Sequence, residues 1–567
     1  MKNNATPATE SRSGGEILAD GLIRQGIDTV FGVPGESFLA VLDAIHDRSD
    51  ALRFVTCRQE GGAAFMADAH AKITGRPGVC LVTRGPGACN ASIGIHTAWQ
   101  DSTPMVVLIG QVPRHHRERE AFQEVEYKHM FAPMAKWVAE VESAERLPEH
   151  LSHAFHLAQS GRPGPVVLAL PEDVLGEVAE ADDLPAAHIA RSAPEPYTID
   201  SFRAHLENAE RPLIILGGSG WSQEASAALG RFAEANEVPV VTSLRCQDYF
   251  DNAHPCYAGD LGIGANPNVV QRVREADTLI VIGARLGDMT TQGYAVPIPP
   301  RSAQTLIHIS PDASEPGHVY FPDLPIISHP SVFAGLIADL APQLPTGRTA
   351  WRAEARTSYE DALIPLQQPG ELDMGVFIAA LSARVPRDAI ITNGAGNYSA
   401  WIHKFWKFRS FRTQLAPTSG AMGYGIPATV AAKLAHPGRL VIGFAGDGCF
   451  QMNGQELATI RQYGLDPLIV VVNNGMYGTI RMHQEREYPG HVYGTDLVNP
   501  DFAALAAAHG LHAETLLRTE DVEAVLDRAL AAEGPALIEC RVDPEGINPR
   551  TTLSKLRHTA QQRRADS

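Results

Sequence analysis

The amino-acid sequence predicts an α/β protein built from three doubly wound parallel-sheet domains. Three observations predict this fold class. Short apolar runs of strand length alternate with amphipathic runs of helix length, and several of the apolar runs lead directly into glycine-rich turns. The chain has 567 residues, a length that corresponds to about three to four domains.

Composition and charge exclude several classes of function. The formal net charge of -18 argues against nonspecific binding of nucleic acids or of an anionic membrane surface. Residues 1–15 contain no basic segment followed by an apolar run, so we expect no secretory signal. No apolar stretch reaches the length of about 18 residues that a membrane-spanning helix needs. The seven cysteines include no C-x-x-C pair, which is typical of reduced thiols. We therefore expect a cytoplasmic protein.

The first domain is expected over residues 14–182. Helical patterns at Ile17–Gln25 and Ala63–Ile73 alternate with apolar runs, and turns at Gly32–Gly35 and Gly85–Gly87 follow two of those runs. The expected strands are Thr29–Phe31, Phe54–Val55, Val79–Val82, Met105–Ile109 and Val166–Leu170.

A proline-containing linker near residues 183–200 leads to a second domain at 200–342. Its first strand is followed by Gly217–Gly220, a turn that is either a nucleotide phosphate site or a close strand-helix connection, because the G-x-G-x-x-G fingerprint is missing. A second linker is expected at about 342–370. The expected strands of this domain are Leu213–Leu216, Pro239–Thr242, Leu279–Ile282 and Leu306–Ile309.

The third domain is expected over residues 370–548, followed by a tail at 549–567. Its most informative stretch is a strand-helix-strand pattern, in which the apolar runs Leu440–Phe444 and Leu468–Val472 flank a helix. The capping box rule places the start of that helix at Asn453, with Glu456 three residues later, and its end at Gly464.

Oxygen-bearing side chains follow both strands of this pattern. Asp447 lies in a Gly-Asp-Gly turn after the first strand, and Asn474 ends an Asn-Asn pair after the second. Ligands of open α/β sheets collect at the carboxyl ends of strands, and Mg²⁺ prefers oxygen ligands, often with substrate phosphates. Alone, the Gly-Asp-Gly turn would be an ordinary surface turn and the Asn-Asn pair an ordinary strand end. Together they predict a site for Mg²⁺ and a diphosphate. The earlier strand Val79–Val82 also enters a Gly-x-Gly turn, with Pro86 in place of Asp447.

Separated blocks of the sequence resemble the thiamine diphosphate enzymes typified by the large subunit of acetolactate synthase. The resemblance covers most of the chain and implies the architecture of that family, with pyrimidine-binding, central and diphosphate-binding domains in this order. The matching blocks are 31–45 (FGVPGESFLAVLDAI), 58–111 (beginning RQEGGAAFMADAHAKITGRPGV), 419–428 (SGAMGYGIPA) and 446–460 (GDGCFQMNGQELATI).

This resemblance implies roles for individual residues. Glu60 would be the acid that hydrogen-bonds the pyrimidine nitrogen of the cofactor. A glutamate in an apolar crevice stays protonatable and therefore suits proton transfer. The carbonyl group of Gly420 would hold the pyrimidine amine, and Met422 would support the bent cofactor. Gln123, in a segment similar to the family's AFQE, would reach the active centre.

The resemblance also implies the metal site and its surroundings. Asp447, Asn474 and the backbone carbonyl of Met476 would bind Mg²⁺. The other positions expected to contact the cofactor are Gly35, Gly396, Asn397, Tyr398, Gly446, Gly448, Cys449 and Gly478.

The implied activity is decarboxylation of a small 2-oxo acid, with pyruvate the expected donor, followed by carboligation. A non-ligating decarboxylase and an aldehyde lyase of the same family are the alternatives. The expected assembly is a homodimer or homotetramer, with Glu60 and the metal supplied by different subunits. A catalytically silent binding protein and a nicotinamide dehydrogenase are further alternatives, which the intact site residues and the missing fingerprint disfavour.

Several positions depart from the pattern of the family. Met289 replaces an arginine that helps to hold substrate, and His483 replaces a tryptophan that selects the second oxo acid. These changes leave the acceptor and the binding of FAD open. His115 and His116 are either a proton-relaying pair or exposed loop residues. Tyr477–Gly494 and the basic tail Arg550–Arg564 are candidates to cover the site.

Overall fold

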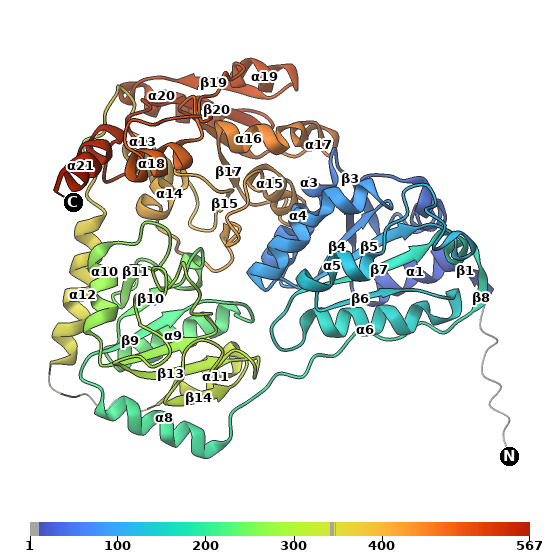
Figure 1. Cartoon of the computed structure of the whole chain (residues 1–567), viewed down its shortest axis with the longest axis horizontal. Coiled ribbons are helices and arrows are strands. Elements are labelled where there is room, and N and C mark those ends of the chain that lie inside the picture. Colours follow the sequence, from blue (N-terminus) through green and yellow to red (C-terminus); the bar gives the residue numbers. More distant parts are fainter. Residues whose placement is uncertain (1–10, 341–344, 346, 567) are drawn as a thin grey trace. The chain divides into compact units, whose positions relative to one another are not determined.

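A computed structural model describes residues 11–340, 345 and 347–566. The chain separates into two compact units, Met1–Ala190 and Arg191–Ser567. The first unit contains one six-stranded sheet and the second contains two, and within each of these sheets every strand pair is parallel (Figure 1). The predicted fold class, three parallel α/β sheets, is confirmed. In the described part of the chain, no helix is long and apolar enough to cross a membrane.

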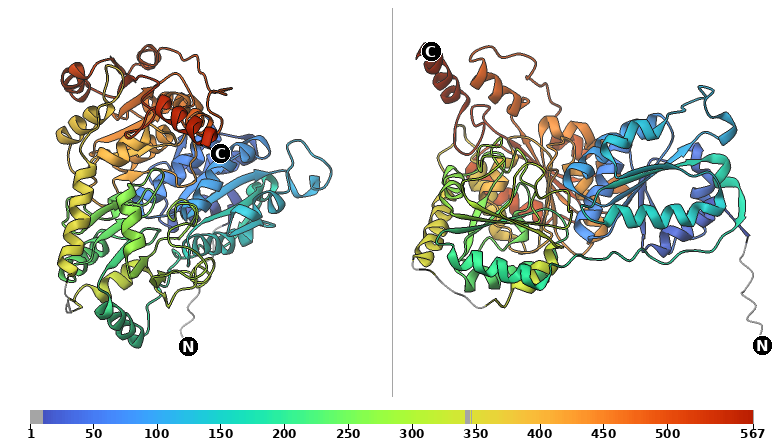
Figure 2. Two further views of the ribbon diagram at one scale, coloured as in Figure 1. Left: turned by 60° about the vertical axis from the view of Figure 1, so that its left-hand side comes forward. Right: turned by 60° about the horizontal axis from the view of Figure 1, so that its bottom comes forward.

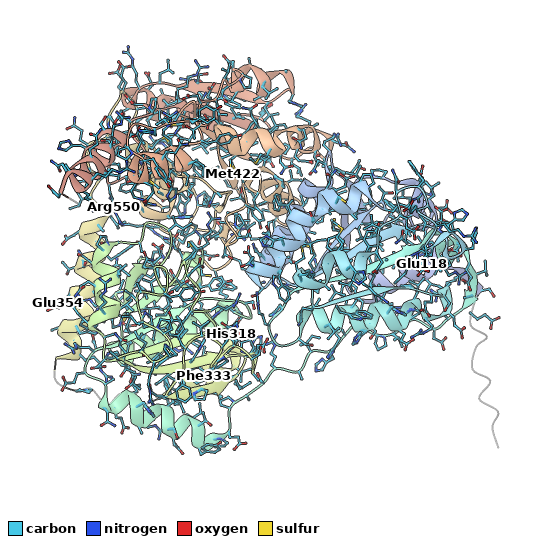
Figure 3. All side chains as sticks on the ribbon, in the orientation of Figure 1. Glu118, His318, Phe333, Glu354, Met422 and Arg550 are labelled. Carbon is cyan, nitrogen blue, oxygen red and sulfur yellow. The ribbon has the colours of Figure 1, made fainter. Side chains whose placement is uncertain are left out.

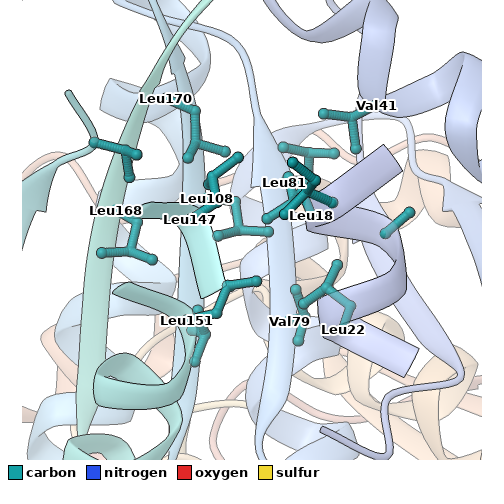
Figure 4. Packing of buried hydrophobic residues seen from close by; sticks show 14 of the residues in the cluster. Leu18, Leu22, Val41, Val79, Leu81, Leu108, Leu147, Leu151, Leu168 and Leu170 are labelled. Carbon is teal, nitrogen blue, oxygen red and sulfur yellow. The ribbon is translucent and has the colours of Figure 1, made fainter. Parts of the chain in front are cut away.

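The sheet of the first unit has the strand order β3-β2-β4-β5-β7-β6. Leucine and valine side chains of its inner strands pack against helices α1 and α6 in a dry core (Figure 4). Its strands are β2 (Thr29–Gly32), β3 (Arg53–Thr56), β4 (Gly78–Val82), β5 (Met105–Gln111), β6 (Trp137–Glu140) and β7 (Pro165–Pro171), beside an antiparallel pair, β1 (Ser11–Ser13) and β8 (Val178–Glu180). Its helices are α1 (Gly14–Arg24), α2 (Leu39–His46), α3 (Glu60–Thr74), α4 (Pro86–Asp101), α5 (Tyr127–Phe131), α6 (Leu147–Gln159) and α7 (Glu172–Gly176).

The central sheet, in the second unit, has the order β11-β10-β9-β12-β13-β14. Successive strand residues belong to different cores, with Ile214 and Leu216 in one and Leu213 and Ile215 in the other. Because side chains alternate along a strand, helices must cover both faces of this sheet. Its strands are β9 (Pro212–Leu216), β10 (Val240–Thr242), β11 (Tyr257–Asp260), β12 (Thr278–Ile282), β13 (Thr305–Ser310) and β14 (Leu324–Ile327). Its helices are α8 (Pro196–Asn208), α9 (Gln223–Ala235), α10 (Pro267–Glu275), α11 (Pro330–Ile337) and α12 (Arg348–Ala362).

The C-terminal sheet has the order β16-β15-β17-β18-β20-β19. Counted along the chain, this is the order of the sheet in the first unit, and β4 and β17 hold the same place in it. Its strands are β15 (Ile390–Asn393), β16 (Gln414–Leu415), β17 (Val441–Gly446), β18 (Leu468–Asn473), β19 (His512–Leu516) and β20 (Ala536–Arg541). Its helices are α13 (Met374–Arg384), α14 (Ser399–Phe405), α15 (Gly425–Ala435), α16 (Asp447–Asn453), α17 (Leu457–Gln462), α18 (Gly478–Glu487), α19 (Phe502–Ala508), α20 (Val522–Leu530) and α21 (Leu553–Asp566).

The expected capping box at Asn453 does not form, although the helical stretch expected after this residue is present. A 3₁₀ turn, Gly454–Glu456, follows Asn453 and leads into α17, and the separate short helix α16 precedes it from Asp447. Asn453 makes no capping bond but donates from Nδ2 to the carbonyl of Gly423 at 3.0 Å. Glu456 is buried and accepts a hydrogen bond from Thr459.

The second expected linker is also wrong where it crosses helix α12. Helix α12 is a yellow helix in Figure 2. Its Trp351 and Ala355 are buried in one of the two cores of the central sheet. The proline residues that suggested a linker lie outside the helix, and residues 341–344 and 346 of that stretch lie outside the described residues. An amphipathic helix of this length gains its stability from packing, which a count of prolines does not reveal.

A loop of the central sheet binds edge strand β16 of the C-terminal sheet. We call residues 243–252 the latch loop. Asp248 in this loop accepts hydrogen bonds at Oδ2 from the backbone N–H groups of Thr413 (2.9 Å) and Gln414 (3.1 Å). Burial raises the pKa of Asp248 to about 7. Among the described residues no partner of its Oδ1 is found, so the ionised carboxylate is incompletely compensated.

Replacement of Asp248 by asparagine is expected to change how stability depends on pH. The folded protein holds the Asp248 proton up to about pH 7, whereas an unfolded aspartate releases it near pH ~3.9. Between these values the unfolded state releases the proton and the folded state does not, so the free energy of unfolding falls by at most about 1.4 kcal/mol per pH unit. Asp248→Asn should become progressively more stable than the unsubstituted protein as pH rises from 4 to about 7. Urea unfolding at a series of pH values measures the gap, and a gap that does not change with pH contradicts the assignment.

Candidate active site

Two neighbouring strands of the C-terminal sheet bring the candidate metal ligands to one edge. Strands β17 and β18 pair in parallel, with Gly446 opposite Val472. Asp447 directly follows the first of these strands, and Asn474 directly follows the second. The carboxyl ends of both strands therefore deliver a carboxylate and an amide oxygen to the same place, as the sequence predicts.

Asp447 is a buried carboxylate held by fixed donors. Its Oδ1 accepts the N–H of Gly448 at 2.9 Å, and its Oδ2 accepts Nδ2 of Asn499 at 2.8 Å. Burial raises the pKa of Asp447, and these hydrogen bonds, with the N–H groups of Gly475 and Met476, oppose that rise. A cation beside this carboxylate would remove the cost of burying its charge.

Asn474 and Met476 form the other half of the site. The Oδ1 of Asn474 accepts the N–H of Met476 at 3.3 Å. A Cβ atom on Gly478 would lie 2.9 Å from Nδ2 of Asn474, so the glycine lets helix α18 approach this side chain. In the described chain no group of three or more His, Cys, Asp and Glu residues is placed to hold a metal. A cation here would depend on mixed carboxylate, amide and carbonyl oxygens, a set that suits Mg²⁺.

Glycines around Asp447 and in the loop after β15 make room for two tyrosine rings. A Cβ on either Gly446 or Gly396 would lie 2.8 Å from the ring of Tyr398, and one on Gly448 would lie 2.5 Å from that of Tyr477. The buried hydroxyl of Tyr398 accepts the N–H of Gly394 at 2.9 Å. The absence of a side chain at these glycines therefore allows the two tyrosine rings to pack against the turns.

Cys449 lies one turn into helix α16 and is buried. Its Sγ accepts the N–H of Gly423 at 3.1 Å, and Sγ lies 3.5 Å from the hydroxyl of Tyr398. Burial raises the pKa of this thiol. Because only the thiolate is a good nucleophile, Cys449 positions the surrounding loops rather than attacking substrate.

The loop between β16 and α15 carries Gly420 and Met422. Gly420 has a φ of +70°, and its N–H donates to the carbonyl of Pro417 at 3.3 Å. No heavy atom outside the local chain would lie within 4 Å of a Cβ on Gly420. Met422, labelled in Figure 3, lies two residues further on and is half-buried. The loop thus leaves space beside Gly420, which a ligand group can use.

The stretch expected to cover the site is helical at its start. Thr479 in α18 exchanges hydrogen bonds of 3.0 Å with the backbone N–H and the Oδ1 of Asn397. Buried Glu485 of the same helix pairs with Arg557 of the C-terminal helix α21, which lowers the pKa of the glutamate. The tail therefore packs on α18, and Thr479 ties this helix to the loop after β15.

In the first unit, Glu60 is the first residue of helix α3. The helix is capped by Gln59, whose side-chain oxygen accepts the N–H of Gly62 at 3.0 Å. Glu60 itself is half-buried and its Oε2 accepts Nδ2 of Asn90 at 2.9 Å. A Cβ on Gly87 would lie 3.4 Å from Oε1, so the turn after β4 flanks the carboxyl group.

Gln123 and Gly35 border turns in the same unit. Gln123 has a φ of +65°, and its backbone carbonyl would lie 2.8 Å from a Cβ on Gly85. A Cβ on Gly35 would lie 2.6 Å from the side chain of Thr83, the residue that directly follows β4. Strained backbone of this kind is common at ligand sites.

The basic loop before Gln123 is neutralised by acidic side chains. Arg114 pairs with Asp173 at 2.8 Å, and Arg117 pairs with Glu124 at 3.2 Å. His115 and His116 lie in an exposed turn with ring centroids 4.3 Å apart. The arginines of this loop are thus held within the unit by ion pairs.

Sequence reasoning missed Asn499. Its Nδ2 bridges Oδ2 of Asp447 and Oδ1 of Asn473, at 2.8 and 2.9 Å. Asn473 in turn donates to buried Glu539 at 2.8 Å. Asn499 precedes a proline in a loop without periodicity, so the sequence near it carries no signal of this role.

Three family models of the thiamine pyrophosphate enzymes match the chain in order. They are the N-terminal TPP binding domain at residues 12–130, the central domain at 199–336 and the C-terminal TPP binding domain at 394–540. The chain belongs to the thiamine pyrophosphate enzymes. Thiamine pyrophosphate is another name for thiamine diphosphate.

Relatives of this thiamine pyrophosphate enzyme are similar over nearly their whole length. The large subunit of acetolactate synthase isozyme 2 from Escherichia coli K12 is 32% identical, with 96% of this chain and 100% of that protein aligned. The isozyme 1 large subunit from the same organism is 34% identical (96% and 97%), and acetolactate synthase from Arthrospira platensis is 33% identical (94% and 95%). The chain is thus a thiamine pyrophosphate-dependent carboligase of the acetolactate synthase type.

Asn499→Ala is expected to weaken the binding of Mg²⁺ together with thiamine pyrophosphate. The change removes the donor that fixes Asp447, and loss of a partner of a metal ligand typically costs about 10- to 100-fold in affinity. Calorimetric titration with Mg²⁺ and the cofactor measures the effect. Asn208→Ala, which removes an amide at the end of α8 bonded to Ala204, is the control. Equal affinities in the two variants would show that Asn499 does not position the carboxylate.

Proposed function

We propose that this enzyme is a Mg²⁺-dependent carboligase that decarboxylates a small 2-oxo acid, with pyruvate as the donor. One observation carries the proposal. Asp447 and Asn474 lie at the ends of adjacent strands, in a chain that aligns over 96% of its length with an acetolactate synthase large subunit.

The residues of the second unit would hold the charged end of the cofactor. Asp447, the Oδ1 of Asn474 and the carbonyl of Met476 would bind Mg²⁺, whose charge would offset that of the diphosphate. The diphosphate would lie against the loop Gly396–Tyr398 and against Gly448, Cys449 and Gly478. When bound, thiamine pyrophosphate supplies a carbanion equivalent that allows a 2-oxo acid to lose CO₂ and its remaining acyl unit to be transferred.

The residues of the first unit would control proton transfer and orientation. The carboxyl group of Glu60 would hydrogen-bond the pyrimidine ring and share its proton, while Asn90 holds the other oxygen of that carboxyl at 2.9 Å. Gln123 would orient substrate, and Gly35 would allow close approach of the cofactor. From the second unit, the carbonyl of Gly420 and the side chain of Met422 would fix the pyrimidine end.

FAD is a candidate second cofactor for the central sheet. The order of that sheet reverses between β9 and β12, where dinucleotides bind in doubly wound folds. A Cβ on Gly218 would lie 1.9 Å from the carbonyl of Gly283, so this glycine allows the loops after β9 and β12 to approach each other. A flavin absorbance band in the purified protein is the direct test.

Cell fractionation tests the expected cytoplasmic location.

Single substitutions at the two centres should have different effects. Glu60→Gln should leave cofactor affinity largely intact but lower turnover by a factor on the order of 10² or more, because it removes a proton-transfer group. Asp447→Ala should abolish retention of the cofactor, because the diphosphate loses its cation bridge. Steady-state kinetics and calorimetry measure the two effects, and normal turnover in both variants would refute this placement of the site.

Mixing the two inactive variants tests the proposed assembly. If Glu60 and Asp447 of one site come from different subunits, a mixed dimer of Glu60→Gln and Asp447→Ala contains one intact site and one doubly changed site. Random co-assembly should then restore about a quarter of the full activity. If both residues of a site come from one subunit, co-expression restores none.

The products from pyruvate separate the proposal from its alternative. A carboligase should form a new carbon-carbon bond with pyruvate, an aldehyde or a second 2-oxo acid, which mass spectrometry detects. Met289 and His483 occupy positions where the resemblance leads us to expect acceptor-binding residues. The identity of the acceptor is therefore what this experiment has to determine. Acetaldehyde without any carboligation product would favour the non-ligating decarboxylase instead.

A further inference from the structure

Arg245 of the latch loop reaches from the central sheet to the two loops that carry the proposed cofactor contacts. Its Nη2 donates to the carbonyl of Gly394 at 3.3 Å, and its Nη1 donates to the carbonyl of Pro417. Gly394 directly follows β15, and Pro417 opens the loop that contains Gly420. One buried guanidinium group therefore joins the starts of both loops.

The backbone of Arg245 is strained. Its φ is +61°, a left-handed conformation that residues with a Cβ rarely adopt and that costs free energy. The strain persists because the rest of the latch loop is fixed on the C-terminal sheet. The backbone N–H of Gln247 donates to Oε1 of Gln414, and Nε2 of Gln414 donates to Oε1 of Gln247. Asn252 exchanges two hydrogen bonds with the backbone of Phe408, at 2.8 and 3.0 Å.

The two carbonyls held by Arg245 belong to structured turns. The N–H of Gly394 bonds to the hydroxyl of Tyr398, and the carbonyl of Pro417 also accepts the N–H of Gly420. A Cβ on Gly394 would lie 2.6 Å from Sγ of Cys449. A shift of either carbonyl would therefore move residues that the proposed site uses.

An arginine suits this position for a geometric reason. Its planar fork presents several donors in fixed directions, whereas lysine offers one compact charge. A guanidinium can bond two carbonyls that belong to different loops at once, and it remains charged at every relevant pH. A lysine could reach one carbonyl but would not hold both in one orientation.

We propose that Arg245 is a positioning residue by which the central sheet sets the relative placement of the loops 394–398 and 417–423, and thereby the affinity for thiamine pyrophosphate. The inference rests on the proposed cofactor site. It gives the central sheet a part in cofactor binding that does not require a nucleotide bound to that sheet.

Arg348 provides a matched control within the same unit. Its buried guanidinium also bonds to backbone carbonyls, at 3.3 Å to Asn236 and at 2.6 Å to Leu206. These carbonyls belong to the central sheet region alone. Loss of either arginine removes hydrogen-bond donors from buried carbonyls, so both changes should lower stability.

The test compares Arg245→Met, Arg245→Lys and Arg348→Met with the unsubstituted protein. Calorimetry with thiamine pyrophosphate and Mg²⁺ should show affinity about 10-fold weaker or more in Arg245→Met, a smaller loss in Arg245→Lys and no loss in Arg348→Met. Turnover at saturating cofactor should fall less than cofactor affinity, because the change weakens binding rather than the chemical step. Thermal unfolding verifies that each variant is folded.

Hydrogen exchange of the cofactor-free protein gives an independent readout. Amides of 394–398 and 417–423 should exchange faster in Arg245→Met but not in Arg348→Met. Unchanged exchange and affinity in folded Arg245→Met, or equal losses in Arg348→Met, would overturn the proposal. If Asp447→Ala binds the cofactor normally, the proposed site fails, while faster exchange confined to the two loops would still support the role of Arg245 in placing them.

Discussion

The parallel pairing of β17 with β18 is the constraint on which the candidate site depends. The register that sets Gly446 opposite Val472 fixes the distance along the sheet edge between the residues that follow. If either strand slipped by one residue, the side chains that follow it would point to the other face. Both strands are almost completely buried, so their apolar side chains hold this register against such a slip.

A polar network converts this register into an electrostatic site. Asp447, Asn499, Asn473 and Glu539 form a chain of hydrogen bonds, and Glu539 ends it in an ion pair with Arg541 at 3.0 Å. Such a network in low dielectric is rigid when its members are satisfied. It leaves a buried carboxylate whose charge still favours a cation, at the sheet edge where a diphosphate would be bound. The chemistry of the enzyme would then be that of the cofactor that binds at this edge of the sheet.

The sequence predicted the parts of the fold and site that depend on local pattern. Apolar runs located most strands, and the Gly-Asp-Gly turn with the later Asn-Asn pair predicted oxygen ligands at the ends of β17 and β18. The short helix α16 before Asn453 was not expected, and Asn453 and Glu456 imitate a capping box although their side chains bond to Gly423 and Thr459. Asn499 and Arg245 could not be found in this way. Asn499 reaches Asp447 across 52 positions, and Arg245 reaches Pro417 across 172, so only tertiary structure brings them together.

The most direct test of the account is a crystal structure of the protein with thiamine pyrophosphate and Mn²⁺ in place of Mg²⁺, because Mn²⁺ scatters anomalously. The account predicts one anomalous peak bound by the side-chain oxygens of Asp447 and Asn474 and by the carbonyl of Met476, with the pyrimidine ring against Glu60 of a second copy. A coenzyme bound without a metal at these oxygens, or a peak at another place, would contradict it.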